Sequence, residues 1–204
     1  DIFFAIKGKY NDGYDFIGEA LKKKASLVVT HKINKRFNLK KQIKVNDTLS
    51  FLTLCSQLFR KNVNSKIIAI TGSCGKTTLK EFIGRTLKKF YKVYYSPKSF
   101  NNKYGVPLSL LNLNQNDKFG IFEIGMDKKG EIDQLSKIIQ PDVGIITNIN
   151  FAHAKNFKNL KGIAEAKGEI INNIKKNGSI ILNADDKFFK FHKKLAIKNR
   201  LNII

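Results

Sequence analysis

The chain has 204 residues, 42% of them hydrophobic, which is enough for one good core or two small domains. Its formal net charge is +22, but the basic residues are spread along the chain and form no long block of like charge. It has no apolar run long enough to span a membrane, and its two cysteines, Cys55 and Cys74, exclude a disulfide framework and favour a reducing, cytoplasmic setting.

The basic balance raises the question of a nucleic-acid partner. Lysine is abundant everywhere in the chain, and the sequence contains neither RNA-reading signatures nor interleaved aromatic and basic residues. We therefore expect no nucleic-acid partner, only a general attraction for polyanionic ligands.

The first part of the chain predicts a small α/β domain. Short apolar runs alternate with amphipathic segments, and Asn46 and Asp47 are cap candidates for the second helix. A polar stretch at 62–66 then marks a boundary, so we expect domains at 1–63 and 64–204. The expected strands lie at 1–6 and 26–30, and the expected helices at 14–25 and 45–63.

The second part repeats the alternation over a longer stretch. Apolar strands with intervening helices indicate a mostly parallel sheet covered on both faces, and such sheets bind ligands beyond the carboxyl ends of their strands. The expected strands lie at 66–71, 92–95, 120–124, 143–148 and 179–183, and the expected helices at 76–89, 104–111, 131–139 and 162–175.

A glycine-rich turn joins the first strand and helix of the second part, in the stretch ITGSCGKTT at 70–78. Two glycines permit a tight turn whose N–H groups face an anion, and the following lysine and threonine suit phosphates and Mg²⁺. The spacing, G-x-x-G-K-T-T, is shorter than in the usual P-loop, and a purely structural turn is the alternative. The predicted ATP-binding residues here are Gly72, Ser73, Cys74, Gly75, Lys76, Thr77 and Thr78.

Further polar residues follow the other strands. Glu123 ends an apolar strand and is a candidate Mg²⁺ ligand, although a solvated strand-end carboxylate is the alternative. Asn101 and Asn102 precede a helix and can hold substrate or phosphate oxygens, or cap that helix. Asn183 and Asp186 follow the last strand and can contact the nucleotide or form a turn. His31 and His192 lack such a context, so we expect them on the surface.

The glycine loop resembles that of the Mur ligase family and of its relative folylpolyglutamate synthase. Four further segments, at 99–111, 122–157, 162–170 and 181–186, resemble the MurF-type branch in order and spacing, most specifically FNN…GVPL. The first 63 residues resemble that branch's N-terminal nucleotide-sugar-binding domain, although Tyr14 stands where the family usually has His. The family's third, C-terminal domain has no counterpart, so the chain resembles a fragment.

The resemblance implies an α/β fold in which the second domain is an incomplete P-loop ATPase. It also implies ATP-dependent amide-bond formation through an acyl phosphate, with ATP and two Mg²⁺ ions. The substrates would be UDP-N-acetylmuramoyl-tripeptide and D-alanyl-D-alanine, and the enzyme would be a monomer. By resemblance the catalytic residues are Lys76, His153 and Lys167; the metal ligands are Thr77, Glu123, His153 and Lys167 as a carbamate; and the substrate contacts are Asn11, Asp12, Gly13 and Asn101.

Other functions remain open at this stage. Within the superfamily they are the ligase that adds the third peptide residue and folylpolyglutamate synthase, and the FNN…GVPL segment argues against both. Outside the superfamily, the alternatives are a nucleotide switch or kinase-like nucleotide binder that does not ligate, and a basic binding module. Without the third domain, we expect this chain to bind ATP–Mg²⁺ weakly and not to ligate.

Overall fold

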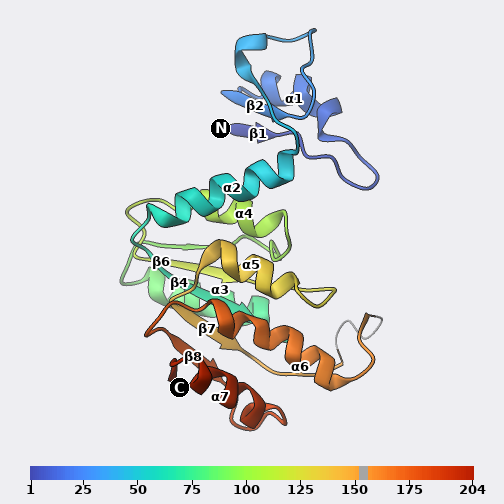
Figure 1. Cartoon of the computed structure of the whole chain (residues 1–204). Helices are drawn as coiled ribbons and strands as arrows, with labels where there is room; N and C mark the ends of the chain where they lie inside the picture. The colour runs from blue at the N-terminus through green and yellow to red at the C-terminus, as the bar shows by residue number, and fades with distance from the viewer. Residues whose placement is uncertain (152–155) are drawn as a thin grey trace. The chain divides into compact units, whose positions relative to one another are not determined.

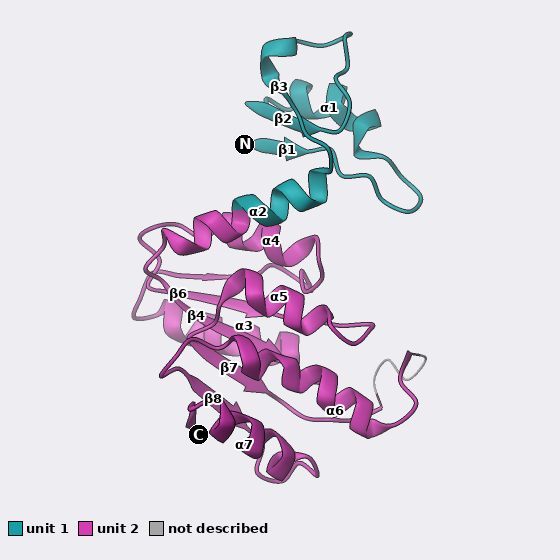
Figure 2. Ribbon diagram, in the orientation of Figure 1, with its two compact units in different colours: residues 1–55 teal, residues 56–204 magenta. Residues whose placement is uncertain are grey.

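The structure is a computed structural model and describes residues 1–151 and 156–204. Two compact units are present, Asp1–Cys55 and Ser56–Ile204 (Figure 2). The division falls within helix α2 (Thr48–Lys61), whose N-terminus is capped because the carboxylate of Asp47 accepts the N–H of Ser50 at 2.6 Å. None of the helices in the described residues is long and apolar enough to cross a bilayer.

The first unit is a small three-stranded parallel sheet in the order β1-β2-β3, with short helices. Ala5, Ile17 and Val28 form its buried centre, so the apolar runs of the sequence supply the core. Its elements are β1 (Ile2–Phe4), the 3₁₀ helix η1 (Gly13–Phe16), α1 (Ile17–Lys22), β2 (Leu27–Thr30), η2 (Leu39–Lys41) and β3 (Gln42–Lys44).

The second unit is a six-stranded parallel sheet with helices on both faces (Figure 1). The mostly parallel α/β fold expected from the sequence is therefore confirmed. Its elements are β4 (Lys66–Thr71), α3 (Lys76–Lys88), β5 (Val93–Tyr95), α4 (Gly105–Leu111), β6 (Phe119–Glu123), α5 (Glu131–Ile139), β7 (Val143–Ile146), α6 (Leu160–Gly168), η4 (Glu169–Asn173), β8 (Ser179–Leu182), α7 (Phe189–Lys198) and β9 (Asn202–Ile203).

The strand order, β5-β6-β4-β7-β8-β9, determines where a ligand can bind. The chain builds β5 and β6 on one side of β4 and then crosses to the other side for β7. Connections diverge at such a point and leave a crevice at the carboxyl ends of the strands. The loop after β4 therefore lies between the end of β6, where Ile70 pairs with Glu123, and the end of β7, where Thr71 pairs with Ile146.

The two faces of this sheet have separate cores. Helix α3 covers one face, packing Leu79, Ile83 and Leu87 against strand residues that include the buried Ile70 and Ile121. Helices α4, α5 and α6 cover the other face, where a larger cluster surrounds Phe122. Each fully buried side chain of this size contributes about 1.5–3 kcal/mol. The glycine loop is thus attached to a strand and a helix that are both firmly packed.

Three features differ from the sequence-based expectations. Strands β3 and β9 and helix α7 had not been predicted, because they are short or too basic to show a clear apolar period. The helix expected at 162–175 turns into the 3₁₀ segment η4 from Glu169 onward. His192 was expected on the surface, and this is wrong: its side chain is buried and its Nε2 lies 2.9 Å from the carbonyl oxygen of Ala164.

Candidate nucleotide and metal site

Two glycines shape the loop between β4 and α3. Gly72 has a φ of 141°, and a Cβ there would lie 1.9 Å from the Oγ1 of Thr147. Gly75 has a φ of 80° and caps α3, with open space where a Cβ would stand. Both positions require glycine, the first because of its neighbour and the second because of its left-handed backbone. The open space over Gly75 leaves room for a ligand at the N-terminus of α3.

The loop is held by the residues that follow β7. Ser73 donates its N–H to the carbonyl oxygen of Asn148 at 2.9 Å, and its hydroxyl donates to the carbonyl oxygen of Asn150 at 2.8 Å. Cys74 donates its N–H to Oδ1 of Asn148 at 3.1 Å and accepts the hydroxyl of Thr147 at 2.7 Å. The polar groups of Ser73 and Cys74 thus fix the loop. Free donors for an anion come instead from the first turn of α3, whose N–H groups have no acceptor within the helix.

Two lysine side chains meet at this loop. Lys76 donates from Nζ to the carbonyl oxygens of Gly72 at 2.9 Å and Ser73 at 3.2 Å. Lys167, which reaches the loop from α6, donates from Nζ to the same oxygen of Gly72 at 2.8 Å. Its side chain is 1% exposed. Burial, followed by the nearby charge of Lys76, lowers the pKa of Lys167 to about 8.

A carboxylate faces the start of α3 from the next strand. Glu123, at the end of β6, accepts the hydroxyl of Thr77 on Oε2 at 2.6 Å. Its other oxygen accepts the side-chain amide of Asn101 at 2.8 Å. Glu123 is only 2% exposed, so this carboxylate is oriented by both partners rather than free in solvent. The sequence-based alternative, a solvated strand-end residue, does not fit this arrangement.

These residues fit a magnesium ion. Mg²⁺ prefers oxygen ligands, keeps several waters and is often bound by one carboxylate together with substrate phosphates. The adjacent oxygens of Thr77 and Glu123 beside the nucleotide loop supply such a donor set. Residues 1–151 and 156–204 contain no cluster of three or more His, Cys, Asp or Glu that could hold a metal alone. His153, a predicted ligand, lies outside the described residues.

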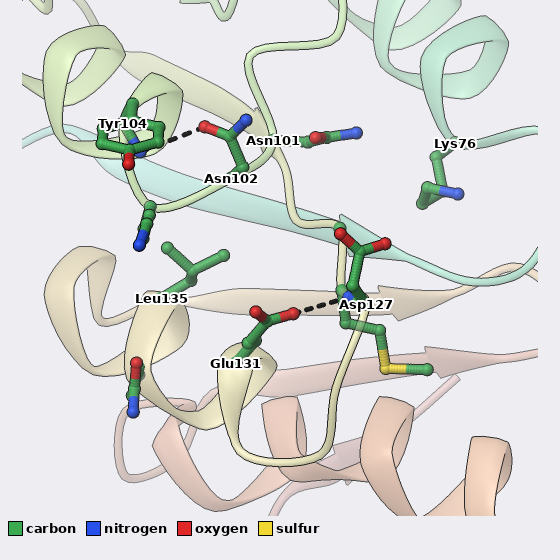
Figure 3. Close-up of a pocket in the computed structure, with 11 residues that line it drawn as sticks. Lys76, Asn101, Asn102, Tyr104, Asp127, Glu131 and Leu135 are labelled. Atoms are coloured by element: carbon green, nitrogen blue, oxygen red, sulfur yellow. Dashed lines mark hydrogen bonds between the residues drawn. The ribbon is translucent and has the colours of Figure 1, made fainter. Parts of the chain in front are cut away.

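A pocket of about 300 Å³ adjoins Lys76 (Figure 3). The loop before α4 and the start of α5 line it. Asn102 caps α4, because its Oδ1 accepts the N–H groups of Tyr104 at 3.0 Å and Gly105 at 2.9 Å, so the cap that the sequence offered as an alternative is present. The residues that line the pocket include Lys76, Asn101, Asn102, Tyr104, Asp127 and Glu131.

The remaining predicted site residues take part in local turns. Asn183 is exposed after β8, and its Oδ1 accepts the N–H of Asp185 at 3.0 Å. In the first unit, Asp12 accepts the N–H of Tyr14 at 2.9 Å, and Asn11 accepts the N–H of Gly8 through its backbone. Gly13 donates to the carbonyl oxygen of Ile6, and a Cβ on Gly13 would clash with that strand end. Asn11, Asp12 and Gly13 thus form an ordered turn in the first unit.

The sequence profile of the Mur ligase middle domain matches residues 70–204. This range begins in β4 and contains the glycine loop, Glu123 and Lys167. The chain belongs to the Mur ligase family.

Individual Mur ligases agree with that assignment. The chain is 41% identical to the UDP-N-acetylmuramoyl-tripeptide–D-alanyl-D-alanine ligase of Buchnera aphidicola, over 97% of the chain and 43% of that protein. It is 32% identical to the crystal structure of MurF from Acinetobacter baumannii, with a TM-score of 0.90, covering 100% of the chain and 44% of that structure. The MurF ligase of Thermotoga maritima in complex with ADP gives 32% identity and a TM-score of 0.85, covering 100% and 46%. The chain thus spans less than half the length of the Mur ligases it matches.

Two carboxylates support this Mur ligase site through contacts between segments that lie far apart in the sequence. Asp186, after β8, accepts the N–H of Ile149 on Oδ2 at 2.7 Å and so braces the segment that holds Ser73. Glu169, in η4, accepts the N–H groups of Gly130 at 2.8 Å and Asp133 at 3.1 Å and so caps α5 from outside. These partners could not be specified from the local sequence, because each contact joins residues more than 30 positions apart.

Proposed function

We propose that this chain carries the ATP and magnesium site of a MurF-type ligase, which joins UDP-N-acetylmuramoyl-tripeptide to D-alanyl-D-alanine through an acyl phosphate. The observation that carries the proposal is the 2.6 Å hydrogen bond between Thr77 and Glu123 beside Lys76. Because Thr77 directly follows Lys76, a cation, a hydroxyl and a carboxylate lie together beside the glycine turn. The names of the curated relatives and the ADP-bound neighbour support the same activity.

In this proposal each residue of the loop has a separate task. Lys76 neutralises the β- and γ-phosphates, and the first N–H groups of α3 bind the same oxygens. Thr77 and Glu123 would hold Mg²⁺, which when bound would neutralise part of the phosphate charge. Ser73 and Cys74, whose polar groups bind Asn148 and Asn150 after β7, hold the loop in place. Thr78 lies in the first turn of α3, where its N–H would bind the nucleotide.

Lys167 has a different role in the proposal. Its amine reaches the loop from α6, and burial lowers its pKa to about 8, so a neutral fraction exists near physiological pH. A neutral amine is what carbamylation by CO₂ requires. We propose that the carbamate of Lys167 and His153 provide ligands for a second magnesium ion. The hydrogen bond from Nζ to the carbonyl oxygen of Gly72 is that of the unmodified side chain.

The proposal also covers the substrates and the setting. Asn101 and Asn102 border the pocket next to Lys76, where the carboxylate substrate would enter, and Asn183 would contact the nucleotide. Asn11, Asp12 and Gly13 would contact the uridine diphosphate part. The domain division at 63, a monomeric state, a cytoplasmic location and a role in cell-wall synthesis, and through it in cell shape and division, belong to the same proposal. The free thiols of Cys55 and Cys74 support the reducing location.

Calorimetric titration of the chain with ATP, with and without MgCl₂, tests the nucleotide site. The proposal expects binding that magnesium strengthens and that competes with ADP. Ligation is tested separately, as phosphate release that requires both UDP-N-acetylmuramoyl-tripeptide and D-alanyl-D-alanine in a protein that contains this chain. Release that needs only one of them, or none, would point to a nucleotide switch or kinase-like activity instead.

A further inference from the structure

Lys80 is a buried cation that the proposed chemistry does not use. It lies one turn beyond Lys76 on α3 and is 0% exposed, which places it with Phe122 and Lys167 among the largest fully buried side chains in the described residues. Lysine is almost never buried to this extent without a partner, because removing an ammonium from water is costly. An apolar residue would fill the same space without that cost, so the ammonium itself is the feature that needs an explanation.

The partner of this ammonium is a backbone oxygen in another loop. Nζ of Lys80 donates a short hydrogen bond to the carbonyl oxygen of Lys98. The nearest carboxylate oxygen, Oε1 of Glu81, is farther away at 3.5 Å. Lys98 has a φ of 47°, a left-handed conformation that costs a non-glycine residue free energy. The contact therefore stabilises a turn that the local sequence does not favour.

That turn begins the segment that leads to the metal-site carboxylate. Residues 96–102 connect β5 to the cap of α4, and the N–H of Phe100 donates to the carbonyl oxygen of Pro97 at 3.2 Å. At the other end, Asn101 donates from Nδ2 to Glu123 at 2.8 Å and accepts the N–H of Gly125 at 2.8 Å. The segment is thus held at two points, by Lys80 and by the Glu123–Gly125 strand end.

We infer that Lys80 is a positioning residue: by holding the carbonyl of Lys98 it places Asn101 so that Glu123 is oriented toward Thr77. The first five residues of helix α3 then carry three linked functions. Lys76 neutralises the phosphates, and Thr77 binds the metal together with Glu123. Lys80 fixes the loop that orients Glu123. The inference rests on the proposed magnesium site, although the part that concerns the loop is independent of it.

The test compares Lys80→Met, which keeps the length and apolar stem of the side chain but removes the ammonium, with the wild-type chain. Amide hydrogen exchange should become at least tenfold faster at Phe100 and Asn101 while exchange in β4 and β7 stays unchanged. ATP affinity without magnesium should change by less than twofold, whereas the gain in affinity on adding magnesium should fall at least tenfold. Adding Lys98→Gly, which removes the strain of the left-handed turn, should restore part of the protection.

Arg85→Met is the matched control, because Arg85 is exposed on the same helix and its Nε lies 3.6 Å from the same Glu81 carboxylate. It should leave the exchange of the loop and the effect of magnesium unchanged. Unchanged protection at Phe100 and Asn101 in Lys80→Met, or a uniform rise in exchange over the whole second unit, would overturn the inference. If the wild-type chain fails to bind ATP, the proposed function fails, while the exchange data still decide the role of Lys80.

A second measurement does not require a variant. In the wild-type chain, the ¹⁵N-detected ammonium protons of Lys80 should exchange slowly and show a coupling across the hydrogen bond to the carbonyl carbon of Lys98. A fast-exchanging ammonium without that coupling would contradict the contact on which the inference depends.

Discussion

Lys76 and Lys167 donate to one oxygen, the carbonyl of Gly72, at 2.9 and 2.8 Å. Two ammonium groups so close to each other repel, and a single carbonyl compensates only part of that repulsion. A phosphate arriving at the loop would give both groups a better partner. The arrangement therefore places positive charge where the nucleotide is proposed to bind. It does so at a cost, because burial, followed by the nearby charge of Lys76, lowers the pKa of Lys167.

This cost should be measurable as a pH-dependent stability. The folded chain binds the Lys167 proton less tightly than the unfolded chain, so the penalty is fully present below pH 8 and is lost as the pH rises to the usual lysine value of 10.5. A shift of this size corresponds to about 3 kcal/mol. In urea unfolding, the stability of the wild-type chain relative to Lys167→Met should rise by about 2 kcal/mol between pH 7 and pH 10.

Lys161→Met, on the exposed face of the same helix, is the control for the other lysines that titrate in this range. The stability of the wild-type chain relative to this variant should not change with pH. A difference between wild type and Lys167→Met that is equally flat from pH 7 to pH 10 would show that the Lys167 amine is not perturbed.

Carbamylation of Lys167 is a separate prediction. In ¹³C-labelled bicarbonate near pH 8.5, the wild-type chain should give a carbamate resonance that increases with MgCl₂. The buried, partly neutral amine is the reason that one lysine should react in preference to the many exposed ones. Lys167→Met should lack that resonance. If the same signal persists in the variant, another amine is the carbamylated group.

Glu123→Gln tests the proposed metal site. The amide keeps the shape of the side chain and can still pair with Thr77 and Asn101, so the fold should tolerate it. Because the negative charge is lost, the gain in ATP affinity on adding MgCl₂ should fall by about 30-fold, a typical size for damage to a metal site. Glu19→Gln, an exposed change in the first unit, should have no effect. An undiminished magnesium effect in Glu123→Gln would remove Glu123 from the metal site.

The two loop glycines should differ in their effect on stability. In Gly72→Ala, the new Cβ meets the side chain of Thr147 at 1.9 Å, so the variant should lose about 2 kcal/mol or more of unfolding free energy. In Gly75→Ala the space is open, and only the left-handed backbone costs free energy, about 1 kcal/mol. Denaturant titration measures both values. Equal losses would mean that the clash at Gly72 is relieved by a small shift of Thr147.

The sequence predicted the parts of this molecule that follow from local pattern. The boundaries of β4 and α5 agree with the prediction, because each combines a clear apolar period with a turn or cap at its end. The neighbourhood of Lys76, Thr77 and Glu123 was also expected, since parallel strands bring their carboxyl ends to one edge.

The contacts that hold the site could not be predicted in this way. In a chain with 38 lysines and arginines, nothing local separates the buried Lys80 and Lys167 from the exposed ones. Lys167 was found only through a family resemblance, and Lys80 was missed. The burial of His192 was also not predicted. Helix α7 has a weak apolar period, so its buried face was not recognised.

The most direct test of the central claim is the ATP affinity of Lys76→Ala in the presence of magnesium, measured by calorimetry against the wild-type chain. If the glycine loop binds the triphosphate, the variant should show no detectable binding, while Lys88→Ala, at the exposed far end of α3, should bind like wild type. Wild-type affinity in Lys76→Ala would contradict the assignment of this loop as the nucleotide site.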